Sequence, residues 1–291
     1  MGDAGDGGVG GEAGAGGGGA GGGDGGGGAE AGNGGGGAAG SGEGGGGGAG
    51  EGGGAGAGNG GGGGDAGGAG GAAGGGGPCP EEMAWISDGF CVDRWEAQVE
   101  VEEGGAWKLH SPYEVLDGVS GALRARSAPG VVPQGYISGV QARAACEGAG
   151  KRLCTRAEFR RACQGPDETT YPYGEVYQEG ACNEGREKHP IIELFGSGPG
   201  VFNSKNMNDP AVNQLPDSLA PTGAYAQCVS AEGTFDMHGN LHEWVDEDEG
   251  TFCGGFYVDA KINGQGCLYT TTAHAISYHD YSTGFRCCLG L

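Results

Sequence analysis

Three side chains that carry oxygen, Asp236, Asn240 and Glu243, lie close together in the segment 233–245, GTFDMHGNLHEWV. Carboxylate and amide oxygens are the ligands that a hard cation such as Ca²⁺ prefers. Gly239 and Asn240 both tolerate positive φ, so the pair predicts a tight turn that aims side-chain and backbone oxygens at one point. The alternative interpretation is a hairpin turn with two solvated acids and a buried Trp244.

Four histidines are candidate ligands for a transition metal. His238 and His242 lie in the same turn segment, where the alternative is that both are surface residues. His274 and His279 follow later in the chain. No Ser-His-Asp or Cys-His arrangement can be argued from their order along the chain.

The elements that position these residues belong to the second of two unlike parts of the chain. Residues 1–77 contain 49 of the 76 glycines, eight acids, and no Lys, Arg or aromatic residue. Such a segment cannot bury enough apolar surface to offset backbone ordering, so we expect a disordered, acidic, Gly-rich linker. Residues 78–291 are long enough for one domain with its own core.

The charge and hydropathy of the chain argue against nucleic-acid binding and against a transmembrane segment. Its net charge is −23, of which the eight linker acids contribute −8 and the domain −15, so a nucleic acid is not expected as a partner. No run of eighteen apolar residues occurs, so no transmembrane segment is expected.

The cysteine content indicates an oxidising compartment. All eleven cysteines lie in the domain, and none forms a C-x-x-C pair that would favour a zinc site. We therefore expect disulfides and an extracytoplasmic, secreted or surface-tethered protein. The first residues, MGDA, have neither the basic region nor the apolar core of a signal sequence, and we hypothesise a signal and a lipid-anchored cysteine upstream of Met1.

Local patterns predict short elements around many loops. Residues 79–96 read as two strands about Asp88-Gly89, a turn that a Cys79–Cys91 disulfide could cross. Capping boxes at 138–141 and 155–158 predict two short helices, the first to about residue 149 and the second to Gly165.

The remaining segments of the domain are less regular. Residues 98–135 read as loops with short strands. Residues 171–225 form a long irregular stretch that needs staples, and Cys182 and Cys228 could supply one. Residues 253–257 and 284–288 read as late strands, each with a glycine where one chain segment passes close to another.

Five segments in order resemble the formylglycine-generating, or sulfatase-modifying factor, family. They are GKRLCTRAEF (150–159), YPYG (171–174), FDMHGNLHEW (235–244), GGFY (254–257) and GFR (284–286). The family pattern runs GKRLPTEAEWE, YPWG, YDMxGNVWEW, RGGSW and GFR. The resemblance covers about residues 79–291 and implies an α+β fold, a variant of the C-type-lectin-like fold with little regular secondary structure.

The resemblance also implies one or two structural Ca²⁺ sites. One site would use the Asp236 and Glu243 side chains with the Gly239 and Leu241 carbonyls. Mg²⁺ is disfavoured because it demands tight octahedral geometry. A second site, mapped more loosely, would use Asn183, Glu184, Asp217 and Leu219.

The family's disulfides carry over in part. Cys146 would pair with Cys287, and Cys163 with a cysteine after the GGFY segment, where Cys267 is the nearest. Cys154, Cys253 and Cys288 are left over, and an odd number of cysteines leaves at least one free or paired between chains.

The family's oxidase chemistry does not carry over. The two cysteines that bind copper in the oxidase members fall on Asp259 and Gly264, so no thiolate pair stands there to select Cu(I) and no copper is expected. The aromatic and Arg-rich run that follows in the family is replaced by LYTTTAH (268–274). His274 and His279 lie where the wall of the oxidase cleft should be.

We therefore expect a calcium-stabilised binding or structural module without formylglycine-generating activity, with an unknown protein or glycan ligand. The alternative is a metal-dependent oxidoreductase of the same family with a divergent active site, which would contain copper or iron.

Overall fold

The computed structural model describes residues 78–291 except residue 273, so the predicted linker 1–77 lies outside the described residues. The first sheet contains the predicted hairpin, in which β1 pairs with β2 about Gly89, whose φ is 101°. Strand β11 pairs with β2 on one side and with β6 on the other. The order β1-β2-β11-β6 is built from Met83–Ile86, Phe90–Asp93, Cys287–Gly290 and Arg152–Leu153.

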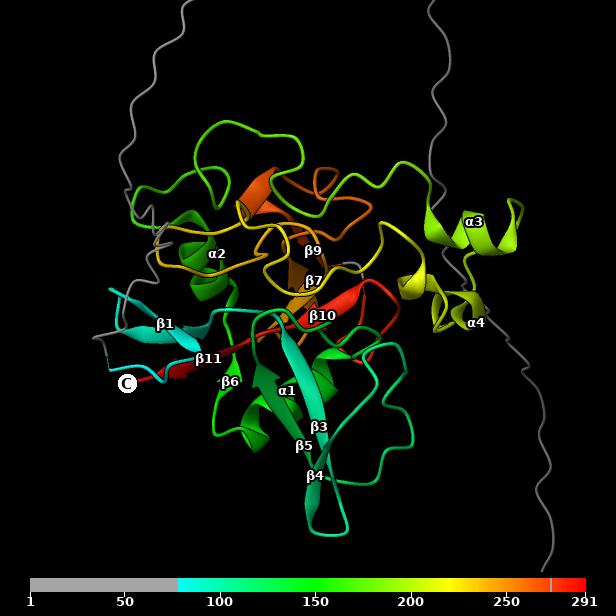
Figure 1. Cartoon of the computed structure of the whole chain (residues 1–291), viewed down its shortest axis with the longest axis horizontal. Coiled ribbons are helices and arrows are strands. Elements are labelled where there is room, and N and C mark those ends of the chain that lie inside the picture. Colours follow the sequence, from blue (N-terminus) through cyan, green and yellow to red (C-terminus); the bar gives the residue numbers. More distant parts are fainter. Residues whose placement is uncertain (1–77, 273) are drawn as a thin grey trace, which may run out of the picture. The chain divides into compact units, whose positions relative to one another are not determined.

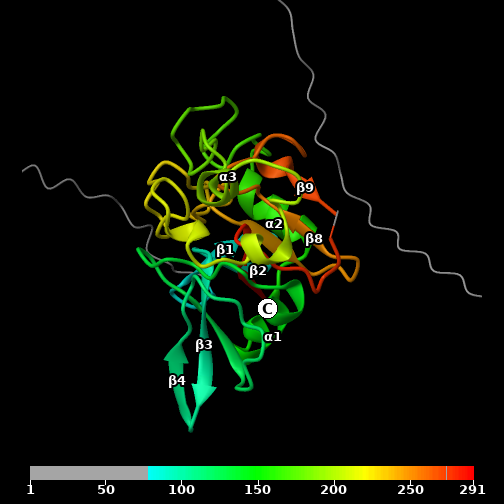
Figure 2. The same ribbon diagram turned by 90° about the vertical axis from the view of Figure 1, so that its right-hand side faces the viewer.

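Two further sheets complete the β-structure. In the second sheet β10 pairs in parallel with β7, and β7-β8-β9 are antiparallel. Its order β10-β7-β8-β9 comprises Thr283–Phe285, His242–Val245, Thr251–Cys253 and Thr270–Thr271. The third, β4-β3-β5, comprises Ala106–Leu109, Ala97–Glu103 and Leu123–Ser127, and its β3-β4 ribbon projects from the rest of the domain (Figures 1 and 2).

Both predicted helices are present, with the predicted caps. Helix α1 spans Gly139–Gly148, and the Ser138 hydroxyl accepts a hydrogen bond from the Gln141 amide. Helix α2 spans Arg156–Gln164, is capped in the same way by Thr155, and ends at Gly165, whose φ is 67°. The capping-box pattern therefore located both helices from the sequence.

The long stretch 171–225 is irregular but contains short helical turns that the sequence analysis did not predict. They are α3 at Pro190–Phe195, α4 at Ser204–Met207 and a 3-10 turn at Val212–Gln214, and a further 3-10 turn follows at Gly266–Leu268. Two start signals are recognisable in retrospect: Pro190 at the first position of α3, and Asn203, whose side-chain oxygen caps α4 by accepting from the Asn206 amide.

The predicted strand at residues 253–257 is wrong beyond its first residue. Strand β8 ends at Cys253, because Gly254 and Gly255 both adopt left-handed backbone conformations, with φ of 85° and 75°. A Cβ at Gly255 would lie 2.5 Å from the Cα of Ala260, so the glycine allows this close approach between chain segments. The chain turns here instead of continuing the strand.

Trp244 on β7 anchors the core that lies between α1 and the second sheet. It is 1% exposed, and it contacts Phe252 edge-to-face with ring centroids 4.9 Å apart. Its indole N–H donates to the carbonyl of Ile137, at a distance of 2.8 Å. The segment that carries the candidate ligands is therefore fixed to the core at its end.

Five disulfides staple the domain. Four of them join the pairs named in the sequence analysis: Cys79–Cys91, Cys146–Cys287, Cys163–Cys267 and Cys182–Cys228. The fifth joins Cys154 to Cys288, and Cys253 stays free and buried. This density of disulfides is typical of an extracytoplasmic protein. No helix among the described residues is long and apolar enough to cross a membrane.

Candidate functional site

Residues 233–245 form a turn that leads into β7. Asp236, Gly239 and Asn240 all have positive φ, of 59°, 82° and 54°, so the predicted tight turn is present. A Cβ at Gly239 would lie 2.2 Å from the carbonyl oxygen of Asn183, and only glycine fits there. The amide of Asn240 donates to that same carbonyl at 2.8 Å, so the turn lies directly against Asn183.

A buried ionic cluster lies beside this turn. Glu96, Asp236, Glu243 and Arg286 are each at most 3% exposed. The Arg286 guanidinium donates to both Glu243 carboxylate oxygens, at 2.6 and 2.7 Å. Asp236 accepts a hydrogen bond from the amide of Gly223 at 2.7 Å. The structure therefore brings the two predicted side-chain ligands, Asp236 and Glu243, into one cluster.

Glu96 is the member of this cluster that the sequence analysis missed. One carboxylate oxygen accepts from the Leu241 amide at 3.1 Å, and the other accepts from the Asn240 side-chain amide at 2.5 Å. Glu96 lies far earlier in the chain and belongs to no local motif. The one signal in the sequence is an acidic residue set between Trp95 and Ala97, just before the strand AQVEVEE, in which apolar and polar residues alternate.

Burial raises the pKa of all three carboxyl groups in the cluster. It raises the pKa of Asp236 to about 6, and it raises that of Glu243 although the Arg286 charge opposes the change. The pKa of Glu96 is raised well above its usual range by burial and then by the charges of Glu243 and Asp236. The raised pKa values favour protonation of these carboxyl groups when no cation is bound. If all three ionised, one guanidinium would not balance their charge, and a divalent cation would favour the ionised forms.

The residues predicted for the second calcium site lie only partly close together. The Asn183 side-chain amide donates to the Ser218 carbonyl and to the Asn240 side-chain oxygen, both at 2.9 Å. Asn183 therefore lies beside the turn that carries Asp217 and Leu219, in which Asp217 has a φ of 56°. Leu219 is buried but Asp217 is exposed.

The Glu184 side chain is directed toward His238 and Lys261. One carboxylate oxygen lies 3.6 Å from a His238 ring nitrogen and 3.5 Å from the Lys261 ammonium. His238 is fully buried, so the interpretation of it as a surface residue is wrong. Neither of its ring nitrogens has a hydrogen-bond partner among the described residues.

His242 is also buried, at 7% exposure, and the surface interpretation is wrong for it too. Its ring nitrogens lie 3.2 Å from the Ser282 hydroxyl and 3.2 Å from the Tyr269 hydroxyl. Burial, with the charge of His274, lowers the pKa of His242 to about 3. Both nitrogens are therefore occupied in a neutral ring that joins β7 to its neighbours.

The two later histidines make separate contacts. His274 stacks on Tyr278, with ring centroids 3.9 Å apart. His279 contacts Asn208 at 2.8 Å and Asp117 at 3.2 Å. Within residues 78–291, residue 273 apart, no three His, Cys, Asp or Glu side chains are placed to hold a metal ion. A calcium ion beside the turn would therefore need backbone carbonyls in addition to carboxylates.

Asp259 closes a loop. One of its carboxylate oxygens accepts from the amides of Lys261 and Ile262, at 3.0 and 3.1 Å, and the other accepts from the Tyr269 hydroxyl at 3.0 Å. At Gly264, whose φ is +125°, a Cβ would lie 2.7 Å from the Leu268 carbonyl oxygen. Neither position presents a nucleophile or a soft metal ligand to solvent.

The remaining sulfur atoms are also unavailable for such chemistry. Cys267 is held by Cys163 in a disulfide, and Cys253 is the one free cysteine in the described part of the chain. Burial raises the pKa of the Cys253 thiol to about 12, so it is protonated at neutral pH.

Comparison with known proteins identifies one family profile. The profile of the sulfatase-modifying factor enzyme 1-like domain matches residues 119–288. No curated protein matches the chain.

Several solved structures are similar to this chain. PvdO from Pseudomonas aeruginosa is 15% identical, with a TM-score of 0.41, over 69% of this chain and 80% of PvdO. CarF is 14% identical, with a TM-score of 0.41, over 69% of this chain and 86% of CarF. The U1 variant of the Major Tropism Determinant is 14% identical, with a TM-score of 0.43, over 73% of this chain and 53% of that protein.

Proposed function

Because the chain belongs to the sulfatase-modifying factor family, through a domain matched over residues 119–288, we propose that it is a binding or structural module of that family without formylglycine-generating activity. The observation that carries this proposal is the loop 259–269. Both carboxylate oxygens of Asp259 accept hydrogen bonds from other residues of that loop, and there is no room for a side chain at position 264. The oxidase chemistry of the family needs two thiolates at these two positions.

Calcium is the proposed structural cofactor, at the turn that the buried cluster supports. Asp236 and Glu243 would supply carboxylate oxygens, and Gly239 and Leu241 would supply carbonyl oxygens. Once ionised, the three carboxyl groups around Arg286 would carry an excess of negative charge that a divalent cation would offset. A second calcium ion is proposed beside Asn183, with ligands from Glu184, Asp217 and Leu219.

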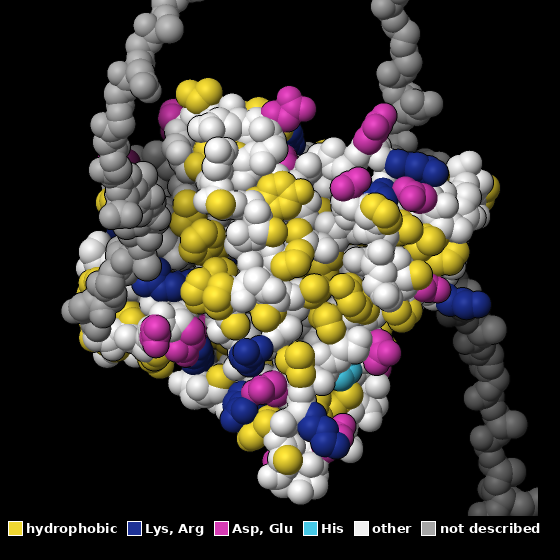
Figure 3. Space-filling view, viewed as in Figure 1, with side chains coloured by type: hydrophobic (Ala, Val, Ile, Leu, Met, Phe, Trp, Pro, Cys, Tyr) yellow, Lys and Arg dark blue, Asp and Glu magenta, His cyan; other side chains and the backbone are white. Residues whose placement is uncertain are grey.

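A binding role is supported by the surface of the domain. Figure 3 shows apolar side chains gathered across the middle of one face, with acidic and basic side chains around them. Contiguous apolar surface of this kind is typical of an interaction site. The proposed partner is a protein or a glycan outside the cytoplasm.

The proposed location is the secreted fraction or the cell surface, with a lipid-anchored tether in the second case. The five disulfides support an oxidising environment. Protease treatment of intact cells, followed by detection of the domain in the medium and membrane fractions, tests the location. Recovery only from the reducing cytosol would contradict it.

Elemental analysis of the purified full chain tests the main proposal. We expect one or two calcium ions per chain, no stoichiometric copper or iron, and no conversion of cysteine to formylglycine in a sulfatase peptide followed by mass spectrometry. Stoichiometric copper or iron, or measurable conversion, would support the divergent oxidoreductase instead.

Thermal unfolding with and without calcium tests the cofactor separately. A ligand present at 100 times its dissociation constant stabilises the folded state by about 2.7 kcal/mol, which EDTA should remove. Asp236→Ala, which removes the side-chain oxygen, should abolish the calcium response of the first site, whereas Asp217→Ala should affect only the second. A melting temperature unchanged by EDTA or added calcium would refute the calcium proposal and leave the binding role open.

A further inference from the structure

A pocket of about 270 Å³ lies between the end of α2 and the loop 229–231, and no residue of the buried carboxylate cluster lines it. This volume is just below the range of about 300–1,000 Å³ that is usual for small-molecule sites, so it suits a single side chain or a small metabolite. The lining residues that matter for its chemistry are Gln164, Asp167, Pro172, Tyr173 and Val229.

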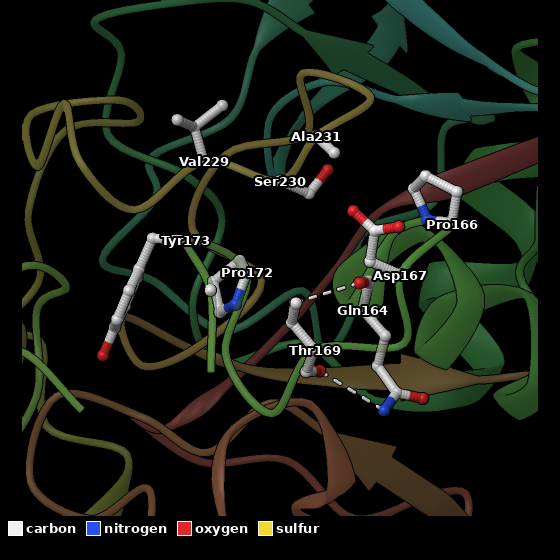
Figure 4. A pocket seen from close by; sticks show the side chains of 10 residues that line it. Gln164, Pro166, Asp167, Thr169, Pro172, Tyr173, Val229, Ser230 and Ala231 are labelled. Atoms are coloured by element: carbon white, nitrogen blue, oxygen red, sulfur yellow. Dashed lines mark hydrogen bonds between the residues drawn. The ribbon is translucent and has the colours of Figure 1, made fainter. Parts of the chain in front are cut away.

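The two sides of the pocket differ in chemistry. Figure 4 shows Tyr173, Pro172 and Val229 on one side, and Asp167 and Gln164 on the other. The first side is apolar and includes an aromatic ring, whereas the second carries a carboxylate and an amide. No Lys, Arg or His lines the pocket, so nothing in its wall neutralises the Asp167 carboxylate.

The polar groups on the second side have unused hydrogen-bonding capacity. Asp167 makes no ion pair or side-chain hydrogen bond with any residue that the structure describes. The Gln164 side-chain N–H groups donate to the carbonyls of Glu168 and Thr169, at 3.4 and 3.3 Å, which leaves its oxygen free. Both free groups are acceptors, so they favour a ligand that is a hydrogen-bond donor.

Both walls are held rigidly before any ligand arrives. Cys163, next to Gln164, is in one disulfide, and Cys228, next to Val229, is in another. The Arg161 guanidinium contacts Glu232 at 2.6 Å, which ties α2 to the loop of the opposite wall. A preformed site loses little conformational entropy when it binds a ligand.

From this arrangement we propose that the pocket binds an alkyl guanidinium or alkyl ammonium group, with the cation at Asp167 and the alkyl stem against Tyr173 and Pro172. A guanidinium also stacks favourably on an aromatic face. The same chemistry occurs in an Arg or Lys side chain of a partner protein and in a free small amine. The inference goes beyond the proposed binding role by naming a ligand class, and it does not depend on calcium or on the loop 259–269.

NMR titration of the oxidised full chain tests this proposal. The probes are n-propylguanidine and n-propylamine, with neutral n-propylurea as the matched control, and methyl glucoside for a sugar. We expect the two cations to shift the amide signals of residues 164–174 and 229–231, with dissociation constants of about 1 mM, typical of weak single-group binding. The urea and the sugar should leave these signals unchanged.

Variants separate a specific contact from the general negative field of the domain. Asp167→Asn should weaken n-propylguanidine binding by about three- to fivefold, the upper part of the range expected for the loss of one exposed ion pair. Glu168→Gln removes a neighbouring acid that does not line the pocket, and it should change binding by less than about twofold. Neither residue is buried, so both variants should keep the wild-type melting temperature.

The source of the cation is tested with the peptide Ac-Gly-Arg-Gly-amide. Binding at least as tight as that of n-propylguanidine indicates a protein partner, and much weaker binding indicates a free small cation. Either result keeps the chemical class. The proposal is overturned if neither cation binds, if the sugar or the urea binds equally well, or if Asp167→Asn and Glu168→Gln weaken binding to the same extent. None of these results would alter the outcome of the calcium or formylglycine measurements.

Discussion

Removal of the Cys146–Cys287 disulfide, by a paired change of both cysteines to alanine, should destabilise the domain much less than its span suggests. The two cysteines are 141 residues apart, and a loop of that length closed on its own corresponds to about 5 kcal/mol in the chain-entropy account. However, Cys154 lies close in sequence to Cys146, and Cys288 is next to Cys287, and these two neighbours form a second disulfide.

With the second link in place, Cys146 and Cys287 are already connected through residues 146–154 and 287–288. The loop that their disulfide closes then has about eleven residues, which corresponds to about 3 kcal/mol. The same argument gives about 3 kcal/mol for the Cys154–Cys288 pair. With both pairs removed, the nearest remaining connection between positions 146 and 287 runs through residues 146–163, the Cys163–Cys267 disulfide and residues 267–287, about 39 residues in all. Removing both disulfides should therefore lower the free energy of unfolding by about 7 kcal/mol in total.

The Cys79–Cys91 disulfide provides the matched control. Its cysteines are only 12 residues apart and no other disulfide encloses them, so its removal should also cost about 3 kcal/mol. Unfolding in guanidinium chloride, followed by tryptophan fluorescence in a Cys253→Ala background that prevents thiol exchange, measures all of these losses. If removing Cys146–Cys287 costs about 5 kcal/mol while removing Cys79–Cys91 costs about 3, the two C-terminal disulfides do not act as one nested pair and the reasoning is refuted.

Three further predictions concern buried groups. Arg286→Met should destabilise the domain by about 3–5 kcal/mol in the same denaturant assay, because Glu243 loses its buried partner, and adding Glu243→Gln should recover part of the loss. In denaturant without reductant, one thiol per chain, that of Cys253, should react with a maleimide. In the native protein at pH 8 no thiol should react, because burial raises the pKa of Cys253 to about 12. Rapid labelling of the native protein would contradict the structure. His189 accepts a hydrogen bond from the Ile191 amide at the start of α3, and burial lowers its pKa from 6.5 to about 4. The unfolded chain therefore binds this proton more readily, so the stabilisation is complete above pH 6.5 and is lost as the pH falls toward 4. Hydrogen exchange of the Ile191 amide should accelerate across that window, relative to helix α1, in wild type but not in His189→Asn, which keeps a side-chain acceptor.

Elements with local signals could be predicted from the sequence. The two capping boxes at Ser138 and Thr155 depend on residues three positions apart, and both helices begin where those boxes place them. The Asp88-Gly89 turn and the Gly239-Asn240 turn depend on adjacent residues that tolerate positive φ. In each case the physical cause lies within a few residues.

Features that depend on distant contacts could not be predicted in this way. Glu96 joins the cluster through contacts with residues more than 140 positions later, and no local pattern marks them. His238 and His242 look like surface residues in a polar turn, but burial is decided by the segments that cover them, such as the one carrying Tyr269. The short helices within 171–225 are too short for the apolar periodicity that marks a helix, and only Pro190 and Asn203 mark their starts.

The place of β11 in the first sheet sets an order of events for the newly made chain. This strand follows all the other described strands in sequence, yet it lies inside the sheet, between β2 and β6, and carries Cys287 and Cys288. While the chain emerges, β2 and β6 each have an unpaired edge, and Cys146 and Cys154 have no correct partner. The domain therefore cannot be completed segment by segment during synthesis or export. It must stay open until β11 inserts, and during that interval strand edges and thiols that lack their native partners are exposed to wrong pairing.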